Sequence, residues 1–144
     1  MIGCMLFATV SFAQNPGWAK KAANAVFTLK TFNADGSLLA SVNGFFINDQ
    51  GMAVSSFAPF KNAQRAVIID AQGKEMEVDC LTGYNDMYDV AKFQVLAKKT
   101  QALNIAQSPA DNGATLWLLP YAVKKVPTCT KGTVKNAEQF GEGY

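Results

Sequence analysis

The most informative absence in this 144-residue sequence is histidine, of which it contains none. Without an imidazole, histidine-based zinc sites and every mechanism that uses a histidine base are excluded. The three cysteines show no C-x-x-C spacing, which argues against a cysteine-only metal site. Basic residues number 13 against 11 acidic residues, with no basic run, so nothing indicates a nucleic-acid partner. No cofactor is expected.

The composition is that of a folded domain. Hydrophobic residues make up 49% of the chain and charged residues only 17%, which excludes a disordered polypeptide. A chain of this length is typical of one domain that can bury a real hydrophobic core.

The amino terminus contains a short apolar run, MLFATVSF, at residues 5–12. Ser11 and Ala13 place small residues at the −3 and −1 positions of a cleavage site after residue 13. We therefore expect residues 1–13 to be a signal peptide and the protein to be exported to the periplasm or cell surface. The run is too short for a membrane span, which needs about 20 apolar residues. The alternative, an apolar core element, stays open because no lysine or arginine precedes the run.

Export would leave Cys80 and Cys129 in an oxidising compartment. Either they form a disulfide, or they are two small buried thiols, which is the more usual state of free cysteine.

Strand patterns dominate the rest of the chain. Alternating or β-branched segments bounded by turn residues predict strands at 25–32, 38–47, 52–55, 65–70, 75–81 and 89–96, with weaker ones at 103–106, 115–119 and 130–135. Glycines 36, 51 and 73 mark hairpin turns, and Gly44 marks a bulge or a close approach of backbone. Short strands at regular spacing without a helical pattern predict an all-β antiparallel barrel or sandwich.

Several conspicuous side chains are expected to be structural. We expect most of the four phenylalanines between residues 45 and 60 to fill the core, although an exposed set could bind a peptide. Core packing is also the expectation for Trp18 and Trp117. The pairs Lys98-Lys99 and Lys124-Lys125 are expected to be solvated loop charges.

One segment, Ser41–Phe60, carries a family resemblance. It resembles the region around the base histidine in trypsin-like serine peptidases of the Deg/HtrA type, which read G-S-G-F-x-I, a turn ending in glycine, a strand ending in T-N, and the catalytic histidine. Gly44–Ile47 matches the first strand, Gly51 the turn glycine and Val54–Ser56 the strand end. Seven residues beyond that glycine, the base position is occupied by Ala58.

A second segment, Tyr88–Val95, resembles the family's D-L-A-L-L-K-V strand, whose aspartate orients the histidine. Asp89 takes that place. Further on, Leu116–Tyr121 and Gly132–Val134 resemble the entry into the second barrel of the family. The resemblance covers about Ala25–Val134.

The resemblance implies a trypsin-like antiparallel β-barrel fold. The first barrel would be complete within residues 14–110, and residues 111–144 would begin a second barrel that is incomplete. In the family's mechanism the aspartate orients an imidazole that takes the proton of a nucleophilic serine. Ala58 cannot accept a proton, and no G-x-S-G motif occurs in the sequence. The implied function is therefore a catalytically inactive member with Asp89 as a relic triad acid and an extended peptide or protein segment as partner.

Other interpretations stay open at this point. The chain could be a fragment of a longer serine endopeptidase-like protein, or an unrelated small β-barrel that serves as a peptide-binding or interaction module. Asp89 could be an ordinary surface carboxylate. A Ser-Lys dyad of Ser55 or Ser56 with Lys61 is the least favoured alternative, because these residue types are common near turns.

Overall fold

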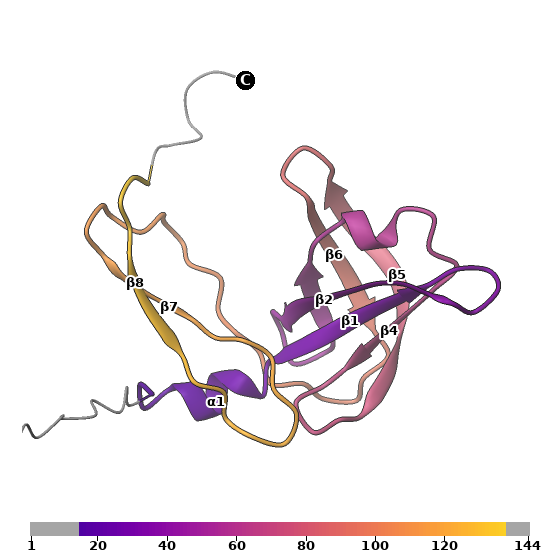
Figure 1. The fold of residues 1–144 in the computed structure, drawn as a ribbon, viewed down its shortest axis with the longest axis horizontal. Coiled ribbons are helices and arrows are strands. Elements are labelled where there is room, and N and C mark those ends of the chain that lie inside the picture. Colours follow the sequence, from indigo (N-terminus) through magenta and orange to yellow (C-terminus); the bar gives the residue numbers. More distant parts are fainter. Residues whose placement is uncertain (1–14, 138–144) are drawn as a thin grey trace, which may run out of the picture.

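The computed structural model describes residues 15–137, and the amino-terminal segment expected to be a signal peptide lies outside them. Figure 1 shows a barrel beside a separate two-stranded hairpin. The elements in chain order are α1 (Ala19–Ala23), β1 (Val26–Phe32), β2 (Leu38–Phe46), β3 (Met52–Ser55), the 3-10 helix η1 (Ala58–Phe60), β4 (Arg65–Ile69), β5 (Glu75–Asn85), β6 (Val90–Val95), β7 (Thr115–Leu118) and β8 (Thr130–Thr133).

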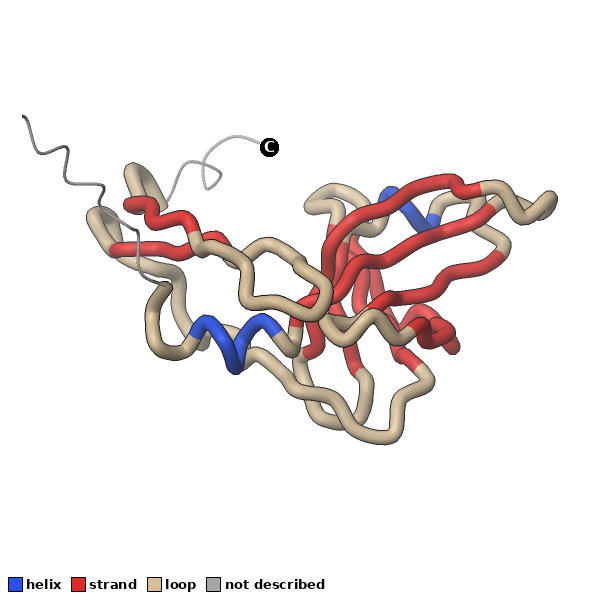
Figure 2. The backbone as a smooth tube through the Cα atoms, turned by 60° about the horizontal axis from the view of Figure 1, so that its bottom comes forward, coloured by secondary structure: helices blue, strands red, loops and turns tan. Residues whose placement is uncertain are grey.

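Six of the described strands form a closed antiparallel barrel, which bears out the all-β expectation. Their order around the barrel is β1-β2-β3-β6-β5-β4, and β4 returns to pair with β1. Figure 2 shows the strands of the barrel gathered together, with the β7–β8 hairpin apart from them. Closure gives each strand two neighbours along part of its length, which satisfies the backbone N–H and C=O groups of those paired stretches. The six strands lie where alternation predicted them, within a few residues at their ends.

The barrel interior is filled by alternate residues of its strands. On β1 the side chains of Phe27, Leu29 and Thr31 are all fully buried, as expected for one face of a period-two strand. Phe27 and Phe93 contact each other across the interior, with ring centroids 6.1 Å apart. Of the phenylalanines expected in the core, Phe46 is buried, and those at positions 57 and 60 are partly buried against it.

Two glycines permit close backbone approaches that a larger residue would prevent. A Cβ at Gly44 would lie 2.6 Å from the ring of Phe27 and 2.7 Å from the carbonyl oxygen of Val54. Gly51 has a φ of 89°, and a Cβ there would lie 2.5 Å from the carbonyl oxygen of Val95. Gly44 is therefore a point of close approach, as its place in a strand suggested.

The β5–β6 hairpin is longer than predicted, because β5 continues to Asn85. The register shifts between Val78 and Cys80 and again between Leu81 and Gly83. Such irregularities bend a strand away from the regular wall. As a result, the expected alternation of solvent-exposed and buried side chains along β5 stops beyond Val78, where most side chains are exposed.

The hairpin β7–β8 lies outside the barrel, pairing Thr115 with Thr133 through Leu118 with Thr130. The strand predicted at 103–106 is wrong. This stretch runs as an irregular connection, and the N–H of Leu103 donates to the carbonyl of Phe46 at 2.9 Å. Without a neighbouring strand, a β-prone segment has no ladder to join.

The core expectation for the tryptophans is also wrong for Trp18, which is 46% exposed. Its ring meets Trp117 edge to face at 6.5 Å, and this contact joins α1 to the hairpin outside the barrel. Cys80 and Cys129 are both free and form no disulfide: Cys129 is buried, but Cys80 lies on the exposed part of β5. Among residues 15–137, no helix is long and apolar enough to cross a membrane.

Candidate functional site

The structure brings Ala58 and Asp89 together at one end of the barrel. Ala58 begins η1, with two residues between it and the end of β3, and Asp89 precedes the first residue of β6. Strands β3 and β6 are neighbours, with Ser55 opposite Ala91. This pairing places the end of one strand beside the start of the other, so two residues 31 positions apart become adjacent.

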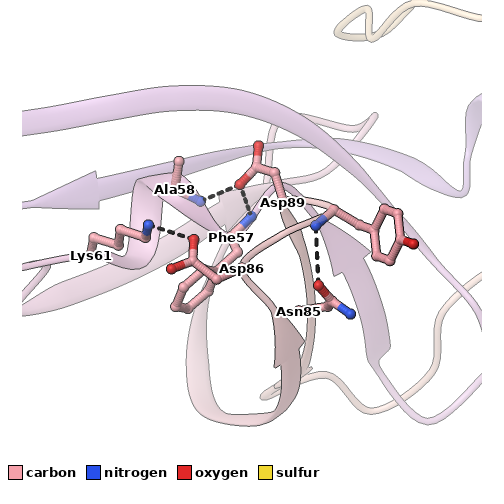
Figure 3. A network of polar contacts seen from close by, with 7 residues as sticks. Phe57, Ala58, Lys61, Asn85, Asp86 and Asp89 are labelled. Atoms are coloured by element: carbon pink, nitrogen blue, oxygen red, sulfur yellow. Dashed lines mark hydrogen bonds and ion pairs between the residues drawn. The ribbon is translucent and has the colours of Figure 1, made fainter. Parts of the chain in front are cut away.

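The carboxylate of Asp89 binds the backbone at the start of η1 (Figure 3). Its Oδ1 atom accepts hydrogen bonds from the N–H groups of Phe57 at 2.9 Å and Ala58 at 2.7 Å. The first N–H groups of a helix have no partner within the helix, and an ionised acceptor binds them more strongly than a neutral one. Asp89 therefore holds η1 against the barrel.

Asp89 reaches this position through a tight turn after β5. Its φ of 50° lies in the left-handed region, which aspartate tolerates better than most residues. Within the turn, the N–H of Tyr88 donates to Oδ1 of Asn85 at 3.1 Å. The N–H of Asp89 donates to the carbonyl of Asp86 at 3.4 Å. The local sequence thus shapes a turn that directs one carboxylate toward η1.

A cation and two aromatic rings lie beside this contact. Lys61 pairs with Asp86 at 2.5 Å, and its Nζ lies 5.4 Å from the ring centroid of Phe57. The Phe57 ring stacks on Tyr84, with centroids 4.3 Å apart and planes 9° apart. Because Lys61 and Asp86 are both exposed, their pair contributes only about 0–1 kcal/mol.

At the position where the resemblance places the base, the side chain offers no group that transfers a proton. The side chain of Ala58 is a methyl group, which cannot orient, accept or donate a proton. The hydroxyl of Ser55 donates to the carbonyl of Asn43 at 2.8 Å, and Lys61 is engaged by Asp86. The Ser-Lys pairing is therefore not formed by Ser55. Within residues 15–137, no group of three metal-ligating side chains gathers.

The β5–β6 hairpin next to the site exposes a group of large apolar side chains. Tyr84 is 65% and Met87 77% exposed. Three more exposed residues lie on the same hairpin: Leu81, Tyr88 and Val90. A gathering of exposed apolar side chains of this kind commonly marks a surface that contacts another molecule.

The backbone of β5 offers an unpaired edge at the same place. Strand β4 pairs with β5 only from Glu75 to Glu77, whereas β6 pairs with it from Val78 to Asn85. Among the described residues, the side of β5 away from β6 thus has no strand partner over positions 78–85. The sequence pattern missed this edge, because a strand's neighbours are set by distant segments.

The scan against models of known protein families finds no match to this chain, and the search among curated proteins finds no relative. Function is therefore inferred from the residues and their geometry.

Proposed function

We propose that this chain is an exported trypsin-like serine peptidase-type domain that has lost its catalytic base and binds an extended protein segment without cleaving it. The observation that carries the proposal is the contact of the Asp89 carboxylate with the N–H of Ala58. It lies at the two positions where the resemblance places the triad acid and the missing base.

The contact has the arrangement that the peptidase mechanism requires of its acid. A carboxylate orients an imidazole only if it lies beside the residue that carries the imidazole. Asp89 has one oxygen on the backbone of residue 58, and the residue as a whole is exposed to solvent. The methyl group of Ala58 leaves that acid without its partner.

The architecture supports the same proposal. The barrel is complete before residue 96, and a separate antiparallel hairpin follows it. We interpret β7–β8 as the first strands of a second barrel. An unrelated, isolated small barrel would not need a hairpin outside its closed wall.

The unpaired edge of β5 is the proposed binding surface. An extended peptide can add to a free strand edge through main-chain hydrogen bonds, while its side chains occupy neighbouring pockets. Leu81 and Tyr84 project from this part of β5 and supply apolar contact area beside the edge. Binding would therefore depend on these two side chains and on an extended conformation of the partner.

Fluorescein-labelled casein, which is largely unfolded, tests both halves of the proposal. We expect the purified chain to raise the anisotropy of the label without producing fragments, and to resist labelling by a serine-directed fluorophosphonate. Leu81→Lys and Tyr84→Lys should each weaken binding, because a charge on an edge strand opposes strand addition. Ile105→Lys is the matched control, since Ile105 is 59% exposed, between the 41% of Leu81 and the 65% of Tyr84, but lies on the connection before β7.

Cleavage of casein that the fluorophosphonate inhibits would overturn the loss of catalysis. Equal binding by the wild type and by both edge variants would overturn the assignment of the binding surface.

A further inference from the structure

Two adjacent pockets lie at the end of the barrel opposite Asp89. The larger, of about 300 Å³, is at the mouth formed by the end of β2 and the start of β5, where Phe46 and Met76 line it. The smaller, of about 210 Å³, lies between α1 and the connection from β7 to β8. Asn24 and Gln72 line both pockets, which therefore share a wall.

The shared wall is built by hydrogen bonds between distant segments. The side-chain amide of Gln72, in the β4–β5 turn, donates to Oδ1 of Asn24 at 2.9 Å. The N–H of Lys124 donates to the carbonyl of Ala71 at 2.7 Å, and its side chain passes close to Gly73. In Figure 1 the β7–β8 connection approaches α1 and the β4–β5 turn at this place. These contacts hold the two pockets in one fixed arrangement.

Six lysines surround the two pockets. The larger pocket is lined by Lys74, Lys98 and Lys99, and the smaller by Lys20, Lys124 and Lys125. They are six of the 13 basic residues of the whole chain. None of the six takes part in an ion pair within the described residues.

Acidic residues do little to balance this charge. Asp70 is the one acidic residue that lines either pocket. Its Oδ1 atom already accepts the N–H groups of Gln72 and Lys74, at 2.9 Å each. Clustered charges of one sign repel one another and raise the local concentration of counter-ions. An anionic ligand would relieve that repulsion.

We propose that the double pocket binds a small polyanion carrying at least two phosphate groups, one in each pocket. Lysine ammonium groups bind phosphate as point charges. The amides of Asn24 and Gln72 supply further hydrogen-bonding groups where the two pockets meet. A nucleic-acid strand fits less well, because single strands need exposed aromatic side chains for base stacking. The one aromatic residue in either lining, Phe46, is itself buried.

The experiment is a calorimetric titration of the full chain with inorganic tripolyphosphate at low and moderate salt. The double variant Lys98→Gln/Lys124→Gln removes one cation from each pocket. The control Lys92→Gln/Lys131→Gln has the same net charge as the pocket variant, but it removes exposed lysines that line neither of the two pockets. We expect the pocket variant to weaken binding about tenfold or more, equivalent to about 1.4 kcal/mol, and the control to bind nearly as the wild type does.

Equal weakening in the two double variants would overturn the proposal, because it would show a response to net charge alone. Binding of orthophosphate as tightly as tripolyphosphate would overturn the two-phosphate requirement. Sedimentation with phosphatidylcholine vesicles, with and without cardiolipin, a lipid that carries two phosphates, distinguishes the source of the phosphate. Displacement from anionic vesicles by tripolyphosphate assigns the site to a lipid headgroup, and tripolyphosphate binding without vesicle binding assigns it to a soluble ligand. A negative result in the polyphosphate experiment would not count against peptide binding at β5, because the two surfaces lie at opposite ends of the barrel.

Discussion

Replacing Ala58 with histidine tests whether the carboxylate of Asp89 faces the position of the lost base. The chain contains no other histidine, so Ala58→His prepared without a histidine tag gives a single imidazole to follow. Asp89 Oδ1 lies 2.7 Å from the backbone nitrogen of residue 58, so an imidazole on that residue can reach the second oxygen. Lys61, the nearby cation, is already paired with Asp86.

The magnitude follows from Coulomb attraction between an imidazolium and the carboxylate. At about 4 Å in a water-like dielectric this attraction is about 1 kcal/mol. That energy corresponds to about 0.7 of a unit and raises the pKa of the introduced imidazole from about 6.5 to about 7.2. Because the folded-state pKa is raised, the added stability is complete below about pH 6.5 and is lost as the pH rises through about 7.2.

The assay is an NMR titration of the imidazole carbon-bound protons. Asp89→Asn in the same background keeps an acceptor for the two backbone N–H groups while removing the charge, and should return the pKa to its ordinary value. Gln107→His, on an exposed part of the connection, supplies the unperturbed reference. An imidazole pKa that is the same with and without the Asp89→Asn change would refute the arrangement. Peptidase turnover should remain absent throughout, because the sequence has no G-x-S-G motif.

Three further outcomes are expected. In urea unfolding, Gly44→Ala should cost roughly 1–3 kcal/mol, because its methyl group would meet ring and carbonyl atoms at 2.6 and 2.7 Å, whereas Gly83→Ala meets nothing within 4 Å and should be nearly neutral. Thr31→Val should raise the free energy of unfolding by about 1 kcal/mol, because it removes a buried hydroxyl that has no partner in the structure. In an absorbance titration, Tyr121 should ionise above the usual tyrosine range, because burial and then a nearby carboxylate raise its pKa. Tyr121→Phe should remove that step. In the wild type the stability linked to the Tyr121 proton is complete below the ordinary tyrosine pKa and is lost as the pH rises from there through the raised value.

The fold was largely predictable because strand patterns are local. Alternation along β1 and along β6 marked their buried faces, and turn glycines marked the hairpins between neighbouring strands. The strand expected at 103–106 failed because forming a strand also requires a neighbour, which the residues of the segment do not specify. The prediction that Trp18 packs in the core failed for a related reason. Its hydrophobicity indicated burial, but its partner Trp117 lies outside the barrel.

The candidate site was predictable only in part. The resemblance selected Ala58 and Asp89, and the pairing of β3 with β6 brings their backbone and side chain into contact. No pattern in the chain indicated the unpaired edge of β5, because an edge is defined by where the neighbouring strand β4 stops.

By itself the sequence determined the absence of an imidazole base, the all-β character and the approximate strands, because these depend on residue type and on neighbours along the chain. The lysines show what only the tertiary structure decided. In the sequence they belong to four separate segments, and the two lysine pairs among them were expected to be ordinary solvated loop charges. Closure of the barrel and the contacts of α1 and the β7–β8 connection bring six of them around two pockets. Electrostatic potential depends on distance in space, so it emerges only when distant segments are packed together.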